Sequence, residues 1–231
     1  MLPDAFFRAL SLLASLDPEV LDAAGVSLSV SAAATLLALL FGLPLGGLVG
    51  LTAFPARRAV VAAINALMAL PTVVVGLVVY ALLSRSGPLG DAGLLYTRTA
   101  MALGQAVLAL PIVAGLAIGA LEHADPRLRA TAWSLGAGRL ATAWLVVREA
   151  RFALLAAGAA AFGRVFSEVG VSMMLGGNLK GETRNLATGI ALETGKGEFA
   201  LGLALGLVLL GVALAVNGAL AWLRAAGRRP R

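Results

Sequence analysis

The sequence predicts an all-α, polytopic membrane protein, and three observations lead to that prediction. Of the 231 residues, 60% are hydrophobic and only 13% are charged, and the mean hydropathy is +0.93. A soluble domain is roughly 25% charged, so this chain has more apolar surface than a water-soluble globule of its size can bury. Several runs without Asp, Glu, Lys or Arg exceed the ~20 residues that a helix needs to cross a bilayer. Helices are expected because lipid-exposed backbone must satisfy its own hydrogen bonds.

Five transmembrane helices are expected within residues 18–224. They are expected at 25–50, 59–84, 99–121, 152–179 and 199–223, and the fourth of these is interrupted by two charges. The first helix is expected to begin earlier, because Asp17-Pro18-Glu19 supplies an N-cap, a proline at N1 and an acid in the first turn. Three prolines inside these spans are expected to kink them: Pro44, Pro71 and Pro111.

Glycines repeat at four-residue spacing in the first span, at Gly42, Gly46 and Gly50. Small residues at this spacing let two helices approach closely. The spacing fits packing within one subunit and also a seam between two copies.

The two ends of the chain are expected to lie outside the lipid core. Residues 1–17 are predicted to form an amphipathic helix in the membrane interface, because the apolar run Ala9 to Leu16 is too short to span and follows Asp4 and Arg8. A half-formed sixth span is the alternative. Residues 225–231 form a basic tail.

The distribution of Lys and Arg predicts the orientation. Five spans place the termini on opposite sides. One side collects Arg57, Arg58, Arg127, Arg129, Arg139, Arg148, Arg151, Arg224, Arg228, Arg229 and Arg231, and the other collects Arg8, Arg85, Arg98, Lys180, Arg184 and Lys196. Cytoplasmic loops carry the excess of basic residues, so the N-terminus is expected outside and the C-terminus in the cytoplasm of a bacterial or archaeal cell.

The loop 122–151 is a charged, cytosolic segment with two tryptophans, Trp133 and Trp144. Gly136 and Gly138 stand between them, and glycine just past a helical run typically ends a helix. A helix, a tight turn and a second helix are therefore expected. The pattern alone fits a docking surface for a soluble partner and equally an interfacial helix pair with tryptophans among the headgroups.

The stretch "ATAWSLGAGRLATAWLVVREAR" resembles the cytoplasmic EAA loop of ABC importer permeases. Ala132 matches an alanine of that motif, Gly136 its glycine and Val146 its apolar position, whereas Ala130 stands where the motif has Glu. In that family the loop is the coupling helix that docks into a groove of the ATPase subunit. The resemblance implies an ATPase-coupling site made of Ala132, Gly136, Gly138, Arg139 and Val146.

Three further stretches resemble the permeases of oxyanion importers. They are "LPTVVVGLVVYALLSRSGPLG", "FGRVFSEVGVSMMLGGN" and "TRNLATGIALETGKGEFALGLALG", and the last is most similar to tungstate permeases. The resemblance implies a type I ABC importer permease core that carries tungstate, with molybdate or sulfate as the alternative. It also implies a homodimer, two cytosolic ATPase subunits that use ATP and Mg, an external substrate-binding protein, and no cofactor in this chain.

Two groups of charged residues stand out, one inside a predicted span and one in an outward segment. Arg164 and Glu168 lie deep in the fourth predicted span and are four residues apart, so they are expected to pair along one helix and neutralise each other. An anion-guiding role for Arg164 is the alternative, because intramembrane charges generally mark function. Lys180, Arg184, Glu193 and Lys196 lie in a segment expected to face outward. They are expected to form an external gate or a docking site for the binding protein. The alternative is that this segment is an ordinary solvated loop.

Enzymatic, metal and nucleic-acid functions are not expected. The chain has no Cys and a single His, His123, so it lacks an H-E-x-x-H motif. In "GIALETGKG" Lys196 is followed by Gly197, which departs from a phosphate-binding loop. The net charge of +6 is assigned to cytoplasmic loops and not to nucleic-acid binding. A self-sufficient secondary transporter or channel is the alternative from a different class.

Overall fold

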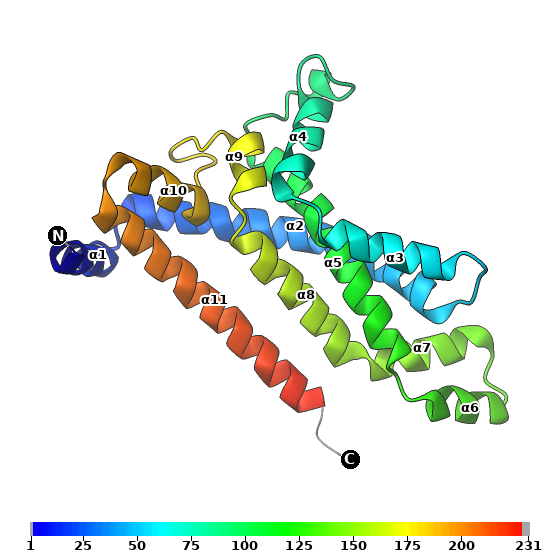
Figure 1. Ribbon diagram of the computed structural model, residues 1–231. Helices are drawn as coiled ribbons and strands as arrows, with labels where there is room; N and C mark the ends of the chain where they lie inside the picture. Colours follow the sequence, from blue (N-terminus) through cyan, green and yellow to red (C-terminus); the bar gives the residue numbers. More distant parts are fainter. Residues whose placement is uncertain (1, 228–231) are drawn as a thin grey trace.

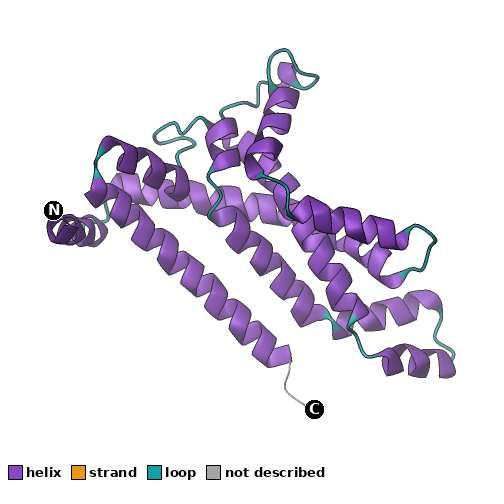
Figure 2. Ribbon diagram, viewed as in Figure 1, coloured by secondary structure: helices purple, strands orange, loops and turns teal. Residues whose placement is uncertain are grey.

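The computed structural model describes residues 2–227. Within that range the chain is helical, with connecting loops and no β-strand (Figure 2). The α-helices are α1 Leu2–Ala14, α2 Pro18–Leu51, α3 Arg57–Met68, α4 Thr72–Leu83, α5 Arg98–Glu122, α6 Pro126–Ser134, α7 Arg139–Glu149, α8 Arg151–Phe166, α9 Gly170–Gly176, α10 Leu186–Lys196 and α11 Phe199–Gly227. A short 3-10 helix, Gly90–Ala92, lies between α4 and α5. The predicted all-α class is confirmed.

The helix α2 is the longest of the described helices, and α5 packs along it (Figure 1). It begins at the predicted residue, because the Asp17 carboxylate accepts hydrogen bonds from the backbone N–H groups of Glu19 (2.9 Å) and Val20 (3.4 Å). A Cβ at Gly46 would lie 2.7 Å from Ala117 Cβ of α5. The glycine stripe of α2 therefore serves packing within the subunit, where it lets α5 approach closely.

Three described helices are individually long and apolar enough to cross a membrane, namely α2, α5 and α11. Two bent pairs pass the same test together: α3 with α4, bent by 95°, and α8 with α9, bent by 64°. These five units correspond to the five predicted spans. The kink predicted at Pro71 is confirmed as a full break between α3 and α4, and the span expected at 152–179 is likewise broken between α8 and α9.

The break between α3 and α4 has a local cause at Pro71. Proline has no N–H to donate to the preceding turn, and its ring disfavours helical geometry at Leu70. Pro71 has extended geometry and its carbonyl accepts from Val74 N, so α4 restarts directly after it. Pro44 and Pro111, by contrast, lie inside α2 and α5, which continue through them as single helices.

The N-terminal α1 is 13 residues long, or about 20 Å, which is shorter than the ~30 Å hydrocarbon core. Its Ala9 is buried in a cluster with residues of α11, including Ala204 and Leu205, while Phe6 and Phe7 remain exposed. The helix is thus docked on the bundle by one face. Its place in the membrane interface stays a prediction.

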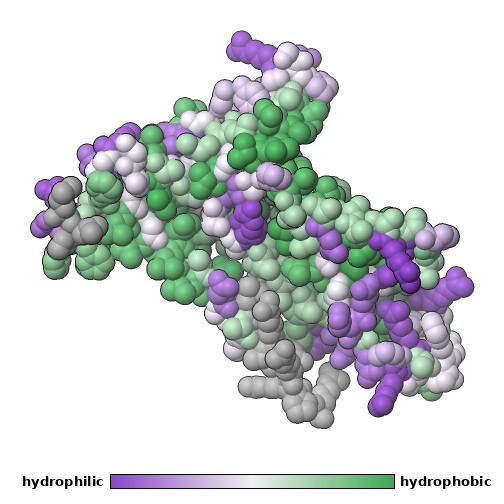
Figure 3. Space-filling model, viewed as in Figure 1, coloured by the Kyte–Doolittle hydropathy of each residue, from purple (hydrophilic) through white to green (hydrophobic). Residues whose placement is uncertain are grey.

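Polar side chains gather at opposite ends of the molecule, with mostly apolar surface between them (Figure 3). One polar end is formed by α6 and α7, and the other by α1, α10 and the loop after α4. The domain boundaries at 1–17, 18–224 and 225–231 stay predictions, and residues 228–231 of the basic tail lie outside the described residues.

Candidate coupling surface and charged clusters

The segment between α5 and α8 folds as a helix, a turn and a second helix, as expected. Asp125 caps α6 through the backbone N–H of Arg127 (2.9 Å). The helix ends at a left-handed Gly136, with φ at +77°, and Ala137 N donates to Ala132 O (2.9 Å). Glycine adopts this conformation without the strain that a Cβ would cause. Gly138 then caps α7.

The inner side of this helix pair is anchored to the ends of the spans. Val146 is fully buried in a cluster with Leu121 of α5 and Ala150 at the start of α8. Ala132 is also buried. The Arg57 side chain forms an ion pair with Glu122, which ties α3 to the end of α5 nearby. Val146 therefore packs α7 against the adjoining ends of α5 and α8.

The outer side of the pair exposes large apolar side chains. Leu140 is 86% exposed, Trp144 is 68% exposed and Trp133 is 61% exposed, and Leu135 is exposed as well. Arg139, Leu140 and Trp133 also line a hollow of about 730 Å³ that lies between this helix pair and the end of α2, at Leu51. Exposed aromatic and aliphatic groups beside arginine are typical of protein-binding surfaces. Arg139 belongs to the predicted coupling site, whereas Leu135 and Leu140 carry no motif and gave no signal in the sequence.

Arg164 and Glu168 do pair, at 2.7 Å, but they do not share one helix. The helix α8 ends at Phe166, and Glu168 lies in the break before α9. Its other carboxylate oxygen accepts from Gly170 N (2.9 Å) and Val171 N (3.4 Å), so the same side chain caps α9 and holds the break. Glu168 is 4% exposed, whereas the Arg164 side chain is 46% exposed.

The two broken spans meet at their breaks. A Cβ at Gly170 would lie 3.1 Å from Thr72 Oγ1 at the start of α4. Further along α9, Ser172 Oγ accepts a hydrogen bond from Gln105 Nε2 of α5 (2.9 Å), and both side chains are buried. Gln105 had no signal in the sequence beyond being a polar residue in an apolar run.

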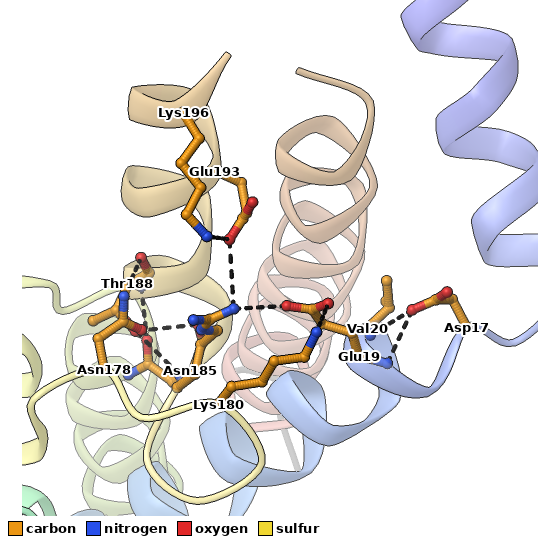
Figure 4. Close-up of polar contacts among 10 residues, drawn as sticks. Asp17, Glu19, Val20, Asn178, Lys180, Asn185, Thr188, Glu193 and Lys196 are labelled. Atoms are coloured by element: carbon orange, nitrogen blue, oxygen red, sulfur yellow. Dashed lines mark hydrogen bonds and ion pairs between the residues drawn. The ribbon is translucent and has the colours of Figure 1, made fainter. Parts of the chain in front are cut away.

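The four predicted external residues come together in one ion-pair network at the opposite end (Figure 4). Arg184 Nη1 donates to Glu19 Oε1 (2.6 Å) and to Glu193 Oε1 (3.4 Å). Lys180 pairs with Glu19 (2.6 Å) and Lys196 with Glu193 (2.9 Å). Glu19, at the start of α2, was missed because it lies 165 residues from Arg184.

The network clamps α10 onto the start of α2. Leu186 N donates to Ser27 Oγ of α2 (2.7 Å), and Asn185 and Thr188 form a capping box at the start of α10. Glu193 is buried and Arg184 is largely buried, while Lys180 and Lys196 are exposed. Arg184 and Glu193 are thus engaged with this chain, which leaves the two lysines as the accessible charges. The described residues contain no group of His, Cys, Asp and Glu that could hold a metal ion.

Comparison with known proteins identifies the family. The chain is 40% identical over 214 residues to the tungstate uptake system permease protein TupB of Peptoclostridium acidaminophilum, covering 93% of this chain and 94% of that protein. It is 44% identical over 197 residues to a protein described as a probable anion ABC transporter permease of Haloferax volcanii, covering 83% and 85%. The chain belongs to the ABC transporter permease family. No family model matches the sequence.

The permease fold is confirmed independently by a solved structure. The inward-facing MetNI methionine ABC transporter contains a chain with a TM-score of 0.72 and 19% identity to this permease, covering 88% of this chain and 94% of that one. The predicted type I importer permease core is therefore confirmed, as is the resemblance to oxyanion permeases. Like these relatives, the permease is a transport component of a membrane.

Proposed function

We propose that this permease is the transmembrane subunit of an ATP-driven importer for an oxyanion, with tungstate as the substrate. The observation that carries the proposal is the similarity to a tungstate uptake permease across nearly the full length of both chains. Molybdate or sulfate is the second candidate. It has weaker support, because similarity falls to 29% with a molybdenum permease and to 28% with a sulfate permease.

The importer would contain two copies of this chain, two cytosolic ABC ATPases and an external substrate-binding protein. The exposed Trp133, Leu140 and Trp144, set among arginines, support ATPase docking at α6 and α7. The excess of basic residues at that end supports a cytoplasmic location for it, with the N-terminus outside. The ATPase would use ATP and Mg, and this chain would carry no cofactor.

Energy would enter through the coupling site named from the motif. Ala132 and Val146 supply the buried anchor, Gly136 and Gly138 set the turn, and the exposed Arg139 would face the partner. Motion would reach the breaks at 69–71 and 167–169, where helices already change direction. The ion pair of Arg164 with Glu168 would hold the second break and leave little net charge to bind an anion.

The external network would act as an outer gate or dock. Lys180 and Lys196 are its exposed cations and could contact the binding protein, while Arg184 and Glu193 keep α10 in place. Substrate selectivity would then reside mainly in the external binding protein, since the described interior offers few free charges.

The test is uptake by proteoliposomes that contain the permease, its ATPase and its binding protein. Tungstate should accumulate only with ATP on the ATPase side, and molybdate or sulfate should enter more slowly. Liposomes with the permease alone should show no transport. Uptake by the permease alone would establish a secondary transporter or channel instead, and equal uptake of sulfate would contradict the choice of tungstate.

A further inference from the structure

An apolar groove opens between α2, α7 and α8, where α7 meets α8. Its volume is about 590 Å³. Its walls are formed by apolar residues of α2 and α8 and its mouth by residues of the α7–α8 junction: Leu39, Leu43, Leu154, Leu155, Gly158 and Ala159 in the walls, and Trp144, Val147, Arg148 and Arg151 at the mouth. The groove had no signal in the sequence, because α2 and α8 are more than a hundred residues apart.

The groove runs from the coupling end along the first half of α8. From Arg151 to Ala159 the helix α8 advances eight residues, or about 12 Å. Half of the hydrocarbon core is about 15 Å thick. The stretch of α8 that lines the groove is therefore slightly shorter than one leaflet is thick. A soluble partner such as an ATPase can cover its mouth but cannot fill its apolar floor.

The mouth carries two arginines without a carboxylate partner among the described residues. Arg151 Nη1 donates to the carbonyl of Arg148 (2.9 Å), and its guanidinium lies 4.6 Å from the Phe152 ring centroid. These contacts hold the guanidinium at the α7–α8 junction and do not neutralise it. Both arginines are exposed, and Trp144 stands beside them. This arrangement differs from the hollow between α1 and α11, whose lining mixes Asp4, Arg8 and Glu198.

We propose that this groove binds an anionic phospholipid, with an acyl chain against Leu39 and Leu155 and the phosphate between Arg148 and Arg151. Phosphate accepts charge-assisted hydrogen bonds from guanidinium groups, and apolar walls with two cations at the mouth match a lipid that has an acidic headgroup. Tryptophan prefers the headgroup level, which places Trp144 at the same depth. In the proposed orientation this lipid belongs to the cytoplasmic leaflet, next to the coupling helices. The inference goes beyond the transported substrate and does not depend on which oxyanion is carried.

The test is native mass spectrometry of the purified permease with phosphatidylglycerol or phosphatidylcholine added. The wild-type chain should retain phosphatidylglycerol in preference to phosphatidylcholine. Arg148→Gln with Arg151→Gln should reduce that preference on the order of tenfold, because each basic residue near an anionic lipid contributes about 1 kcal/mol. The matched control is Arg58→Gln with Arg127→Gln, which removes two exposed charges from the same end and should leave the preference unchanged.

A second variant tests whether the apolar floor of the groove is needed, independently of the two arginine charges. Ala159→Phe fills the floor and leaves both arginines in place, so it should lower lipid retention with unchanged helicity by circular dichroism. Equal retention of both lipids by the wild type would overturn the proposal. An equal loss of lipid preference in the two double arginine variants would also overturn it. So would an Ala159→Phe variant that no longer dimerises but keeps its lipid, since the groove would then be a contact between two copies. If Ala159→Phe does not fold, the two arginine pairs still decide the outcome.

Discussion

The two polar ends of this molecule use charge in opposite ways. At the α1–α10 end, Arg184, Lys180 and Lys196 all form ion pairs with Glu19 or Glu193 of the same chain, although the two lysines remain exposed. At the α6–α7 end, Arg139 has no ion pair among the described contacts and stands next to exposed Leu140 and Trp144. Internal pairing makes a clamp, whereas unpaired arginines with exposed aromatic groups make a surface for another molecule. A count of basic residues per loop does not distinguish the two.

The largest expected effect concerns the sides of the membrane on which these ends lie. The chain has no native Cys, so single Cys residues can report exposure. Ser86→Cys and Thr194→Cys should react with an impermeant thiol reagent added outside, and Ala56→Cys and Ala226→Cys should not. Labelling of Ala226→Cys from outside would reverse the assignment of the two ends and remove ATPase docking at α6 and α7.

The break between α8 and α9 is held by the ion pair of Arg164 with Glu168, so stability should fall most when one member of this pair is removed. Glu168→Ala leaves Arg164 without its carboxylate and two N–H groups of α9 without a cap, so it should cost about 3 kcal/mol of stability. Adding Arg164→Ala should recover most of this and leave the lost cap, about 1 kcal/mol. Unfolding in detergent micelles measures both values. A well-assembled double variant without transport would show instead that Arg164 guides the anion.

The clamp should depend on Glu19. Glu19→Ala removes two short ion pairs and should lower the free energy of unfolding by about 2 kcal/mol, since Arg184 keeps only the longer contact with Glu193. The matched control is Glu182→Ala in the loop that holds Lys180 and Arg184, an exposed residue expected to change stability by less than about 0.5 kcal/mol. Equal values for the two variants would mean that the network contributes nothing and that α10 is held by apolar packing.

ATPase binding by the coupling surface should be lost when the turn at Gly136 is changed. Gly136→Trp forces a side chain onto a backbone with φ at +77° and adds bulk at the docking face, so ATPase co-purification and transport should both fall roughly tenfold or more. Gly138→Ala is the close control, because Gly138 has φ at −69° and open space for a Cβ. Gly195→Trp is the control at the other end, preferable to Gly90, where a Cβ would collide with the Ser84 carbonyl. Full ATPase binding by Gly136→Trp would make α6 and α7 a membrane-surface anchor only.

The smallest effect is expected at Arg139. Arg139→Glu reverses an exposed charge, and an exposed ion pair contributes only ~0–1 kcal/mol, so ATPase affinity should fall severalfold at most at low salt. The loss should shrink as salt is raised, because screening weakens exposed charges. Affinity titrated at two salt concentrations measures this. A loss as large as that of Gly136→Trp would indicate a buried contact for Arg139 in the assembled importer.

Local signals determined much of this structure. The cap at Asp17, the restart after Pro71 and the turn at Gly136 each depend on a few neighbouring residues, so they can be read directly from the chain. The apolar runs likewise determined the five membrane units, because the length of a span is set by the thickness of the bilayer.

Only the tertiary structure decided which residues meet. Glu168 looked like one member of an i,i+4 pair on a helix, but its second oxygen caps α9, and that competing contact ends α8 first. Glu19 reaches Arg184 because α10 folds back on α2, and Arg148 and Arg151 stand at the mouth of a groove because α8 runs beside Leu39. Leu140 is exposed and Val146 is buried on the same short helix, since burial depends on which face the spans cover. Such contacts follow from packing between distant segments, and no window of sequence contains both partners.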